Sequence, residues 1–143
     1  MSLFSAISVS ASGMAAQRTR AELLVENLAN VETTRTPGGG PYRRKDAVFT
    51  PAAAESPFAA LLSNELEPQG VEVAEVVTDT REPERRYLPG HPDADADGYV
   101  LFPRINPAED MVDLMGAARG YQANVAAITA VKDMIQRSLD LLR

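Results

Sequence analysis

The sequence predicts an α+β protein that is mainly α, with long N- and C-terminal heptad helices packed as a coiled coil and a small β-rich module inserted between them. Near both ends of the chain, apolar residues recur at alternating steps of three and four, which places them on one face of a helix. The middle carries short alternating runs separated by glycine and proline, a pattern typical of short strands and turns.

The C-terminal helix is predicted from Pro107 to Leu142. Asn106 can cap it, Pro107 suits its first position, and the acidic residues that follow favour the positive end of the helix dipole. An average step of about 3.5 residues is that of a helix that supercoils around a partner. Val131 can cover the interruption at Lys132. The members of this C-terminal stripe are Met111, Leu114, Ala118, Tyr121, Val125, Ile128, Lys132, Ile135, Leu139 and Leu142.

A second stripe with the same spacing predicts an N-terminal helix over residues 3 to 31. Its first half is rich in alanine, serine and glycine, which allow close packing but weaken an isolated helix. We therefore expect this helix to be stable only when packed. It should end near Asn30, because a β-branched run and a Pro-Gly-rich loop follow. The stripe consists of Leu3, Ile7, Ser10, Met14, Gln17, Ala21, Leu24, Leu28 and Val31.

These patterns divide the chain into an N-terminal axial helix (1–32), a loop and small β-rich middle module (33–105), and a C-terminal axial helix (106–143). Strands are predicted at 42–49, 70–80, 85–88 and 99–102. In the first of them, Tyr42 and Val48 should share a face. A short helix is predicted from Ser56 to Leu66.

Composition excludes several functional classes. The chain has 143 residues, no cysteine and one histidine, so disulfides, thiolate metal sites and most histidine chemistry are excluded. Its net charge is −6, and the stretch from Asp46 to Tyr99 carries twelve acidic and three basic residues, which would repel nucleic acid. No run approaches the roughly twenty apolar residues that cross a bilayer. The N-terminus also lacks the basic and apolar regions of a secretory signal.

The sequence predicts no catalytic, cofactor or metal site. Asp93, Asp95, Asp97 and Gly98 match the opening of an EF-hand loop, but Arg104 stands where the last calcium ligand should be, which favours a solvated turn. The three glycines from Gly38 lack the lysine of a phosphate-binding loop and fit a hinge better. His91 has no nucleophile in a suitable context. We therefore expect a protein that is not an enzyme.

The two helical stripes have two interpretations. They could form an antiparallel pair within one chain, or they could also pack against other chains. Assembly is favoured because the first helix is weak alone and both stripes are longer than a small core needs. We expect Leu28→Asp or Ile128→Asp to abolish assembly. The residues predicted to pack within and between subunits are Leu3, Ile7, Met14, Leu24, Leu28, Val31, Met111, Leu114, Tyr121, Val125, Ile128, Ile135, Leu139 and Leu142.

Three short motifs stand out, Ser12-Gly13-Met14, Asn27-Leu28-Ala29-Asn30 and the run from Tyr121 to Val125. They resemble motifs of the bacterial flagellar rod and hook axial proteins. The loop before Lys45, the aspartate run and the acidic start of the C-terminal helix bring the resemblance nearest to the proximal rod members. Arg104 departs from the pattern, since these proteins usually have asparagine there. The motif residues are Ser12, Gly13, Met14, Asn27, Leu28, Ala29, Asn30, Pro41, Tyr42, Arg43, Tyr121, Gln122, Ala123, Asn124 and Val125.

This resemblance implies a structural subunit of the proximal rod, the drive shaft that transmits torque from the flagellar motor to the hook and spans the periplasm. The terminal helices would form an inner tube, with the middle module facing outward. Export from the cytoplasm would use the flagellar type III apparatus. The implied partners are other copies of the chain, other proximal and distal rod proteins and the adaptor region that joins the rod to the MS ring, without nucleic acid or membrane insertion. The alternatives are another rod subunit, a non-flagellar coiled-coil adaptor and a calcium-binding module.

Overall fold

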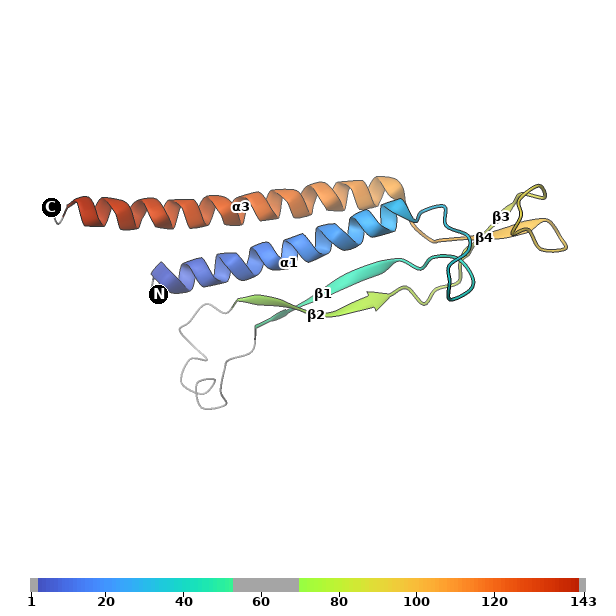
Figure 1. Cartoon of the computed structure of the whole chain (residues 1–143), viewed down its shortest axis with the longest axis horizontal. Coiled ribbons are helices and arrows are strands. Elements are labelled where there is room, and N and C mark those ends of the chain that lie inside the picture. The colour runs from blue at the N-terminus through green and yellow to red at the C-terminus, as the bar shows by residue number, and fades with distance from the viewer. Residues whose placement is uncertain (1–2, 53–69, 142–143) are drawn as a thin grey trace, which may run out of the picture.

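The computed structural model describes residues 3–52 and 70–141, and it confirms the predicted α+β class (Figure 1). Two long helices, α1 (Leu3–Ala29) and α3 (Pro107–Asp140), lie at the ends of the chain. Between them come the strands β1 (Lys45–Pro51), β2 (Val71–Thr78), β3 (Glu84–Tyr87) and β4 (Tyr99–Phe102). As predicted, the Asn106 side chain caps α3 by accepting a hydrogen bond from the Ala108 amide at 3.1 Å.

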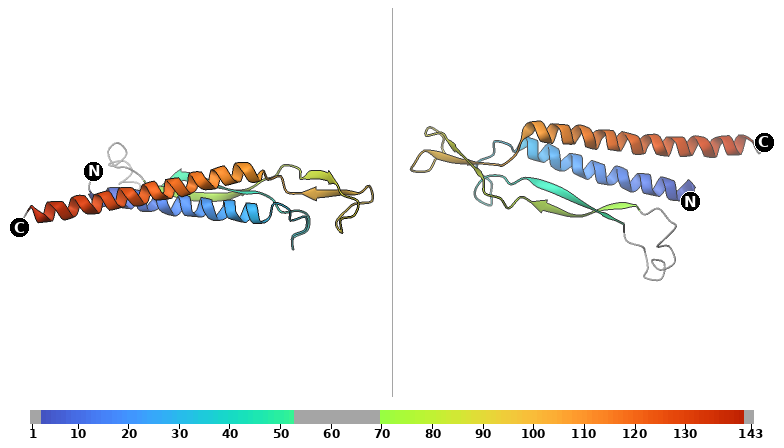
Figure 2. Two further views of the ribbon diagram at one scale, coloured as in Figure 1. Left: turned by 90° about the horizontal axis from the view of Figure 1, so that it is seen from above. Right: turned by 180° about the vertical axis from the view of Figure 1, so that it is seen from behind.

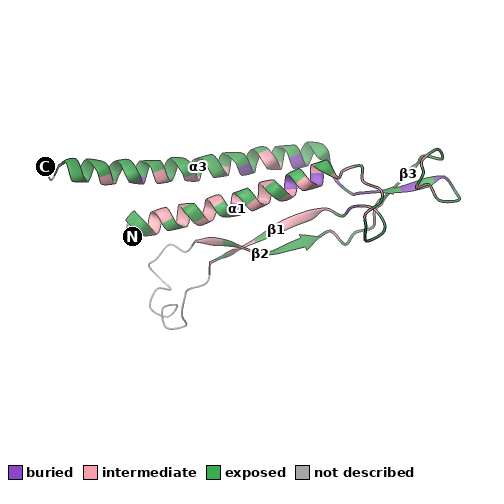
Figure 3. Ribbon diagram, viewed as in Figure 1, coloured by how far each residue is buried: buried purple, intermediate pink, exposed green. Residues whose placement is uncertain are grey.

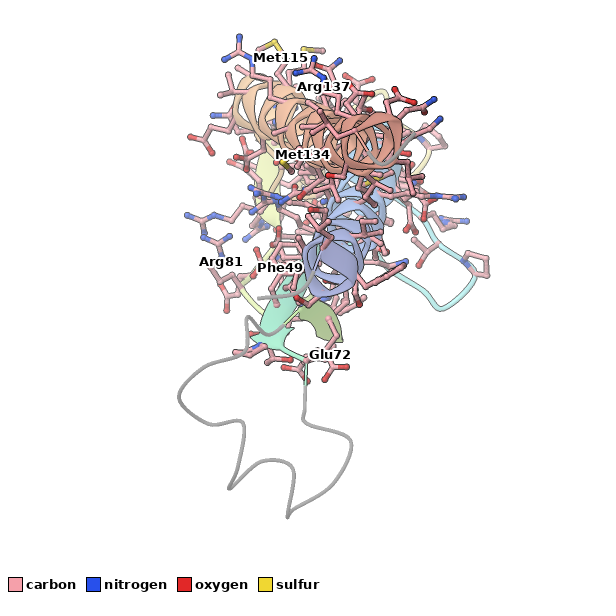
Figure 4. The ribbon with its side chains drawn as sticks, turned by 90° about the vertical axis from the view of Figure 1, so that its left-hand side faces the viewer. Phe49, Glu72, Arg81, Met115, Met134 and Arg137 are labelled. Atoms are coloured by element: carbon pink, nitrogen blue, oxygen red, sulfur yellow. The ribbon has the colours of Figure 1, made fainter. Side chains whose placement is uncertain are left out.

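The helices and the longer strands form three layers. α1 and α3 run antiparallel side by side, and the β1–β2 ribbon lies along α1 on the side away from α3 (Figures 1 and 2). The end-on view in Figure 4 shows the same order of α3, α1 and ribbon. The β3–β4 ribbon extends beyond the ends of the helices (Figure 1). Consequently α1 is covered on two sides, whereas α3 packs against α1 alone among the helices and strands described.

Each ribbon is a separate antiparallel pair. β1 pairs with β2 from Lys45 opposite Thr78 to Pro51 opposite Val71, with a shift of register between Val48 and Phe49. Such a bulge bends a strand and increases its twist. β3 pairs with β4 in the projecting ribbon. The middle of the chain is therefore two ribbons in two places, one on the helices and one beyond them.

The first strand begins three residues later than the sequence predicts. The Tyr42 amide donates to the Thr33 carbonyl at 3.0 Å, which closes the preceding loop and removes Tyr42 from the strand. Tyr42 is buried, whereas Val48 is 39% exposed, so the two do not share an environment. The remaining predicted strands agree with the structure to within two residues. The predicted helix from Ser56 to Leu66 lies outside the described residues.

A buried asparagine in α1 holds the start of β1. Asn27 is completely buried, and its Nδ2 donates to the Lys45 carbonyl while its Oδ1 accepts from the Lys45 amide, both at 2.9 Å. The Tyr42 hydroxyl donates to the same Oδ1 at 3.0 Å. Burial, with nearby Glu26, raises the pKa of Tyr42 to about 12. The Asn27 amide thus pairs with Lys45 as a neighbouring strand would, and it fixes β1 on the helix.

Arg44, the residue before Lys45, links this junction to α3. Arg44 Nη2 lies 2.9 Å from Asp110 Oδ1 in the first turn of α3 and 3.2 Å from Asp46 Oδ1. Asp110 is 1% exposed. Burial raises the pKa of Asp110 above its usual value, and the guanidinium of Arg44 opposes that rise. Such a pair contributes little net stability but fixes position, because losing one partner leaves a buried charge.

Close contacts also hold the other end of the ribbon and the two helices. The Ser12 hydroxyl accepts from the Val71 amide at 3.0 Å, and a Cβ added at Gly70 would come within 2.7 Å of that hydroxyl. Between the helices, a Cβ added at Gly13 would lie 3.0 Å from the amide atoms of Asn124. Glycine at these two positions therefore leaves room for the close approach of α3 and β2 to α1.

We expect Asn27→Ala to lower the free energy of unfolding by about 3 kcal/mol, because the buried polar groups of Lys45 and Tyr42 lose their partners. Urea unfolding of the purified chain measures this loss, and amide exchange at Lys45 should become faster. Gln136→Ala, at an exposed position of α3, is the matched control. Equal unfolding free energies for the two variants would show that Asn27 does not anchor β1.

We expect Gly13→Leu to destabilise the helix pair by about 1 to 3 kcal/mol, the usual cost of overpacking. Gly116→Leu should leave stability unchanged or raise it slightly, because no heavy atom lies within 4 Å of a Cβ at Gly116. Thermal unfolding followed by circular dichroism compares them. Adding Asn124→Ala should recover part of the loss in Gly13→Leu, and an additive double variant would contradict the proposed contact.

Candidate assembly surface

The C-terminal stripe does not face α1 as a single unit. On α3, the row that faces α1 contains Asp110, Ala117 and Val131, all buried and separated by multiples of seven residues, together with half-buried Asn124. The second row, with Leu114, Ile128 and Ile135, is half-buried beside it. Val131 thus lies inside the contact and Lys132 outside it. Small and polar side chains in the first row allow α3 and α1 to approach closely. Because part of this row is polar, apolar periodicity in the sequence does not reveal it.

The other half of the predicted stripe is left exposed. We define the open stripe of α3 as Met111, Met115, Ala118, Val125, Thr129 and Leu139. Met111 is 56% exposed, Met115 55% and Leu139 60%. Figure 3 shows α3 exposed along nearly its whole length, and Figure 4 places Met115 on the side of α3 away from α1. Tyr121, also predicted to pack, is 38% exposed, and Leu142 lies outside the described residues.

α1 has an exposed stripe that the sequence analysis did not identify. We define the outer stripe of α1 as Phe4, Ser8, Ala11, Ala15, Arg18, Glu22, Val25 and Ala29, all exposed and spaced by alternating steps of three and four. Phe4 is 79% and Val25 53% exposed. Because half of these side chains are small and two are charged, an apolar pattern does not find them, although the spacing alone could have done so.

The predicted packing residues of α1 lie elsewhere on the helix. Leu24 is buried, and Ile7, Met14, Leu28 and Val31 are half-buried. Leu3, at the start of the helix, is 42% exposed. Most of the N-terminal stripe is therefore occupied within the chain.

Several of the motif residues have contacts that define the fold. Besides Ser12, Gly13, Asn27 and Tyr42, Asn30 closes the end of α1 by donating to the Glu26 carbonyl at 2.9 Å. Arg43 Nη1 donates to the Asp79 carbonyl at 3.0 Å, and Asn124 Nδ2 donates to the Gly120 carbonyl at 2.9 Å. Pro41 is half-buried. The exposed motif residues are Ala29, Arg43, Tyr121, Gln122, Ala123 and Val125.

Two of the three aspartates predicted to form a turn, Asp93 and Asp95, have separate side-chain contacts. Asp95 Oδ1 accepts from the amides of Asp97 at 3.0 Å and Tyr99 at 2.8 Å, and these bonds hold the pKa of Asp95 below its usual value. Asp93 pairs with Arg35 and accepts from the Thr34 hydroxyl at 2.7 Å. In the described part of the chain, no three acidic, histidine or cysteine side chains are grouped so that they could hold a metal ion. The loop therefore shapes the β3–β4 hairpin and attaches it to the segment after α1.

His91 belongs to the same turn. Its Nδ1 accepts from the Asp93 amide at 3.1 Å, and its ring lies edge-on to Phe102 with centroids 6.2 Å apart. Both contacts are structural.

Of the helices described, none combines the length and apolar character needed to span a membrane.

Comparison with known proteins agrees with this geometry. Residues 96–141, which contain β4 and α3, match the family described as the C-terminal region of the flagellar basal body rod FlgEFG proteins. The flagellar basal-body rod protein FlgC of Borreliella burgdorferi is 40% identical over 100% of this chain and 99% of its own length. FlgC of Bacillus subtilis is 37% identical, with 99% of each chain covered. FlgC of Salmonella typhimurium is also 37% identical, over 99% of this chain and 98% of its own.

The similarity extends over the helices, both ribbons and the connecting loops, because nearly the full length of each chain is covered. The chain belongs to the FlgC family of flagellar basal-body rod proteins, and it is a structural subunit of the flagellar rod.

Proposed function

We propose that this subunit transmits torque through its two terminal helices, which pack side by side with those of neighbouring subunits in the proximal rod. The open stripe of α3 is the observation that carries the proposal. It is long, it lies beside the surface that packs on α1, and its apolar residues alternate with the polar residues Gln122, Lys132 and Gln136 on the same face. Each of its methionine, valine and leucine side chains that becomes well buried contributes about 1.5 to 3 kcal/mol, so these residues together can hold a rigid joint.

The predicted packing residues then have two tasks. Those that face the interior, such as Leu24, Leu114 and Ile128, hold α1 and α3 together within one subunit. Those of the open stripe, such as Met111, Val125 and Leu139, join subunits. One chain therefore uses its helical stripes in both of the ways considered above, as an antiparallel pair within the subunit and as a contact between subunits. Torque passes through the joint because neither helix can slide without uncovering apolar surface.

The division into an N-terminal axial helix, a middle module and a C-terminal axial helix is also part of this proposal. Residues 33–105 include the β1–β2 ribbon, which packs against α1, and the β3–β4 ribbon, which extends beyond the helices. We place the helices in the inner tube and the middle module outside it. The apolar character of α3 and the mixed charge of the ribbons support that arrangement.

The partners proposed are further copies of this chain, the other proximal and distal rod proteins, the adaptor region that joins the rod to the MS ring, and the flagellar type III export apparatus. A thin core supports export in a loosely folded state. In the described parts of the two helices, the buried apolar residues are Ala16, Leu24, Ala117 and Val131, and two of these four are alanine. Helices that share so little core have only a small free energy of unfolding in the monomer, and assembly adds to their burial.

An adaptor outside the flagellum and a calcium-binding module are the competing functions. If the chain is an adaptor, we expect a compact monomer with fully formed helices. If it is a rod subunit, we expect terminal helices that gain order on assembly. Circular dichroism before and after assembly distinguishes them. The calcium module predicts micromolar calcium affinity by calorimetric titration, which the separate contacts of Asp93 and Asp95 do not favour.

We expect Val125→Asp to abolish rod assembly and motility while leaving the monomer folded. Val125 is 40% exposed, so the charge meets water in the monomer but is buried without a partner in the rod. Motility in soft agar and the presence of the chain in purified basal bodies measure the effect. Thr80→Asp, at an exposed loop position, is the control. Normal swimming with Val125→Asp would contradict the role of the open stripe.

A further inference from the structure

A cavity of about 490 Å³ lies beside the projecting β3–β4 ribbon. The ribbon contributes Arg85, Tyr99 and Leu101 to its lining, and the segment that follows α1 contributes Arg35 and Pro41. A volume of this size is within the range of pockets that bind ligands. Because the ribbon extends beyond the ends of the helices (Figure 1), the cavity lies apart from the surfaces that the helices offer to neighbouring subunits.

One face of the β3–β4 ribbon provides the cavity with an exposed aromatic and apolar floor. Arg85 lies opposite Leu101 in the ribbon. Tyr87 lies opposite Tyr99 two residues further along, so the four side chains share one face. Tyr87 is 64% exposed, Tyr99 39% and Leu101 43%. Tyrosine and arginine are enriched among the side chains that contribute most to protein interfaces.

The charged residues of the cavity have their acceptors occupied and most of their donors free. Asp93 uses one carboxylate oxygen for Arg35 and the other for the Thr34 hydroxyl. Asp95 uses one oxygen for two backbone amides and the other for Arg85, at 3.3 Å. A guanidinium has five N–H donors, and each of these arginines meets its aspartate through one nitrogen. The arginine side chains are 73% and 59% exposed, so their other donors are accessible.

Both guanidinium groups are held in position by the fold. The Cζ atom of Arg85 lies 4.8 Å from the centre of the Tyr99 ring, which is a cation–π contact. Arg35 is fixed by its pair with Asp93, whose side chain is only 19% exposed. A planar guanidinium that is already fixed loses less conformational entropy when it binds a carboxylate. The cavity therefore fits a ligand that presents acceptor oxygens and an apolar group side by side.

We propose that this cavity binds an acidic segment of another protein. A carboxylate of that segment pairs with Arg35 and Arg85, and an apolar side chain next to it lies against Leu101. Fixed arginines recognise acidic motifs through charge-assisted hydrogen bonds. A second copy of this chain is a less suitable source, because the chain has a net charge of −6 and like charges repel. The inference goes beyond the proposed function, since it does not depend on how the helices pack.

Site-specific photocross-linking in cells that assemble rods tests the proposal. A photoreactive phenylalanine analogue replaces Leu101, and mass spectrometry of purified basal bodies identifies the cross-linked segment. That segment is synthesised as a labelled peptide and titrated with the purified chain by fluorescence anisotropy. We expect an aspartate or glutamate beside the cross-linked residue, and an affinity that falls about tenfold when both Arg35→Gln and Arg85→Gln are present. Arg104→Gln, at an exposed arginine outside the cavity, is the matched control.

A charge exchange separates loss of binding from loss of folding. Arg85→Glu alone should weaken binding, and a peptide with arginine in place of its acidic residue should bind that variant better than the original peptide does. Equal affinities for the double glutamine variant and the control, or a cross-linked segment without an acidic residue, would overturn the proposal. So would a cross-link to a glycan, to a lipid or to a second copy, or no cross-link at all in intact rods. The proposed function would stand in each of these cases, because it is tested separately by Val125→Asp.

Discussion

The buried amide of Asn27 is the interaction on which the arrangement of the layers depends. A two-stranded ribbon is marginally stable in water, so β1 and β2 need a fixed attachment to the helices. Asn27 provides it by exchanging two hydrogen bonds with the backbone of Lys45. One residue earlier, Arg44 reaches Asp110 at the start of α3. Two adjacent residues thus connect the ribbon to both helices, and the positions of β1, α1 and α3 are determined together.

The close approach of the layers leaves a thin core, and this has a consequence for function. Glycine, alanine and serine in α1 allow α3 and the ribbon to come near, but such residues bury little apolar area. Many large apolar side chains remain exposed, and α3 carries more of them than any other described helix or strand. In an ordinary soluble protein, exposed apolar stripes of this kind would cause aggregation. In a rod subunit, the same stripes form the contacts between subunits. The fold and the need for assembly therefore have one cause.

The residues that carry the resemblance to the rod proteins are largely those that form the junctions. Ser12 holds β2, Gly13 admits Asn124, and Tyr42 completes the bonds of Asn27. These residues are small or polar, and each must fit one contact geometry. Apolar residues on the open stripe need only be apolar and of suitable size. Short motifs in this chain therefore identify how the subunit folds, while its assembly surface is distributed over a whole helix face.

The sequence by itself determined the two helices, the N-terminal cap of α3, most of the strands and the class of protein, because these depend on local periodicity, turn residues and recognisable motifs. It did not determine which face of α3 meets α1, since the contact uses Ala117 and Asn124 in place of the apolar row at Ala118 and Val125. It also could not separate the two ribbons or find the outer stripe of α1. Those features depend on close packing and on polar groups paired across the fold, and only the tertiary structure brings such partners together.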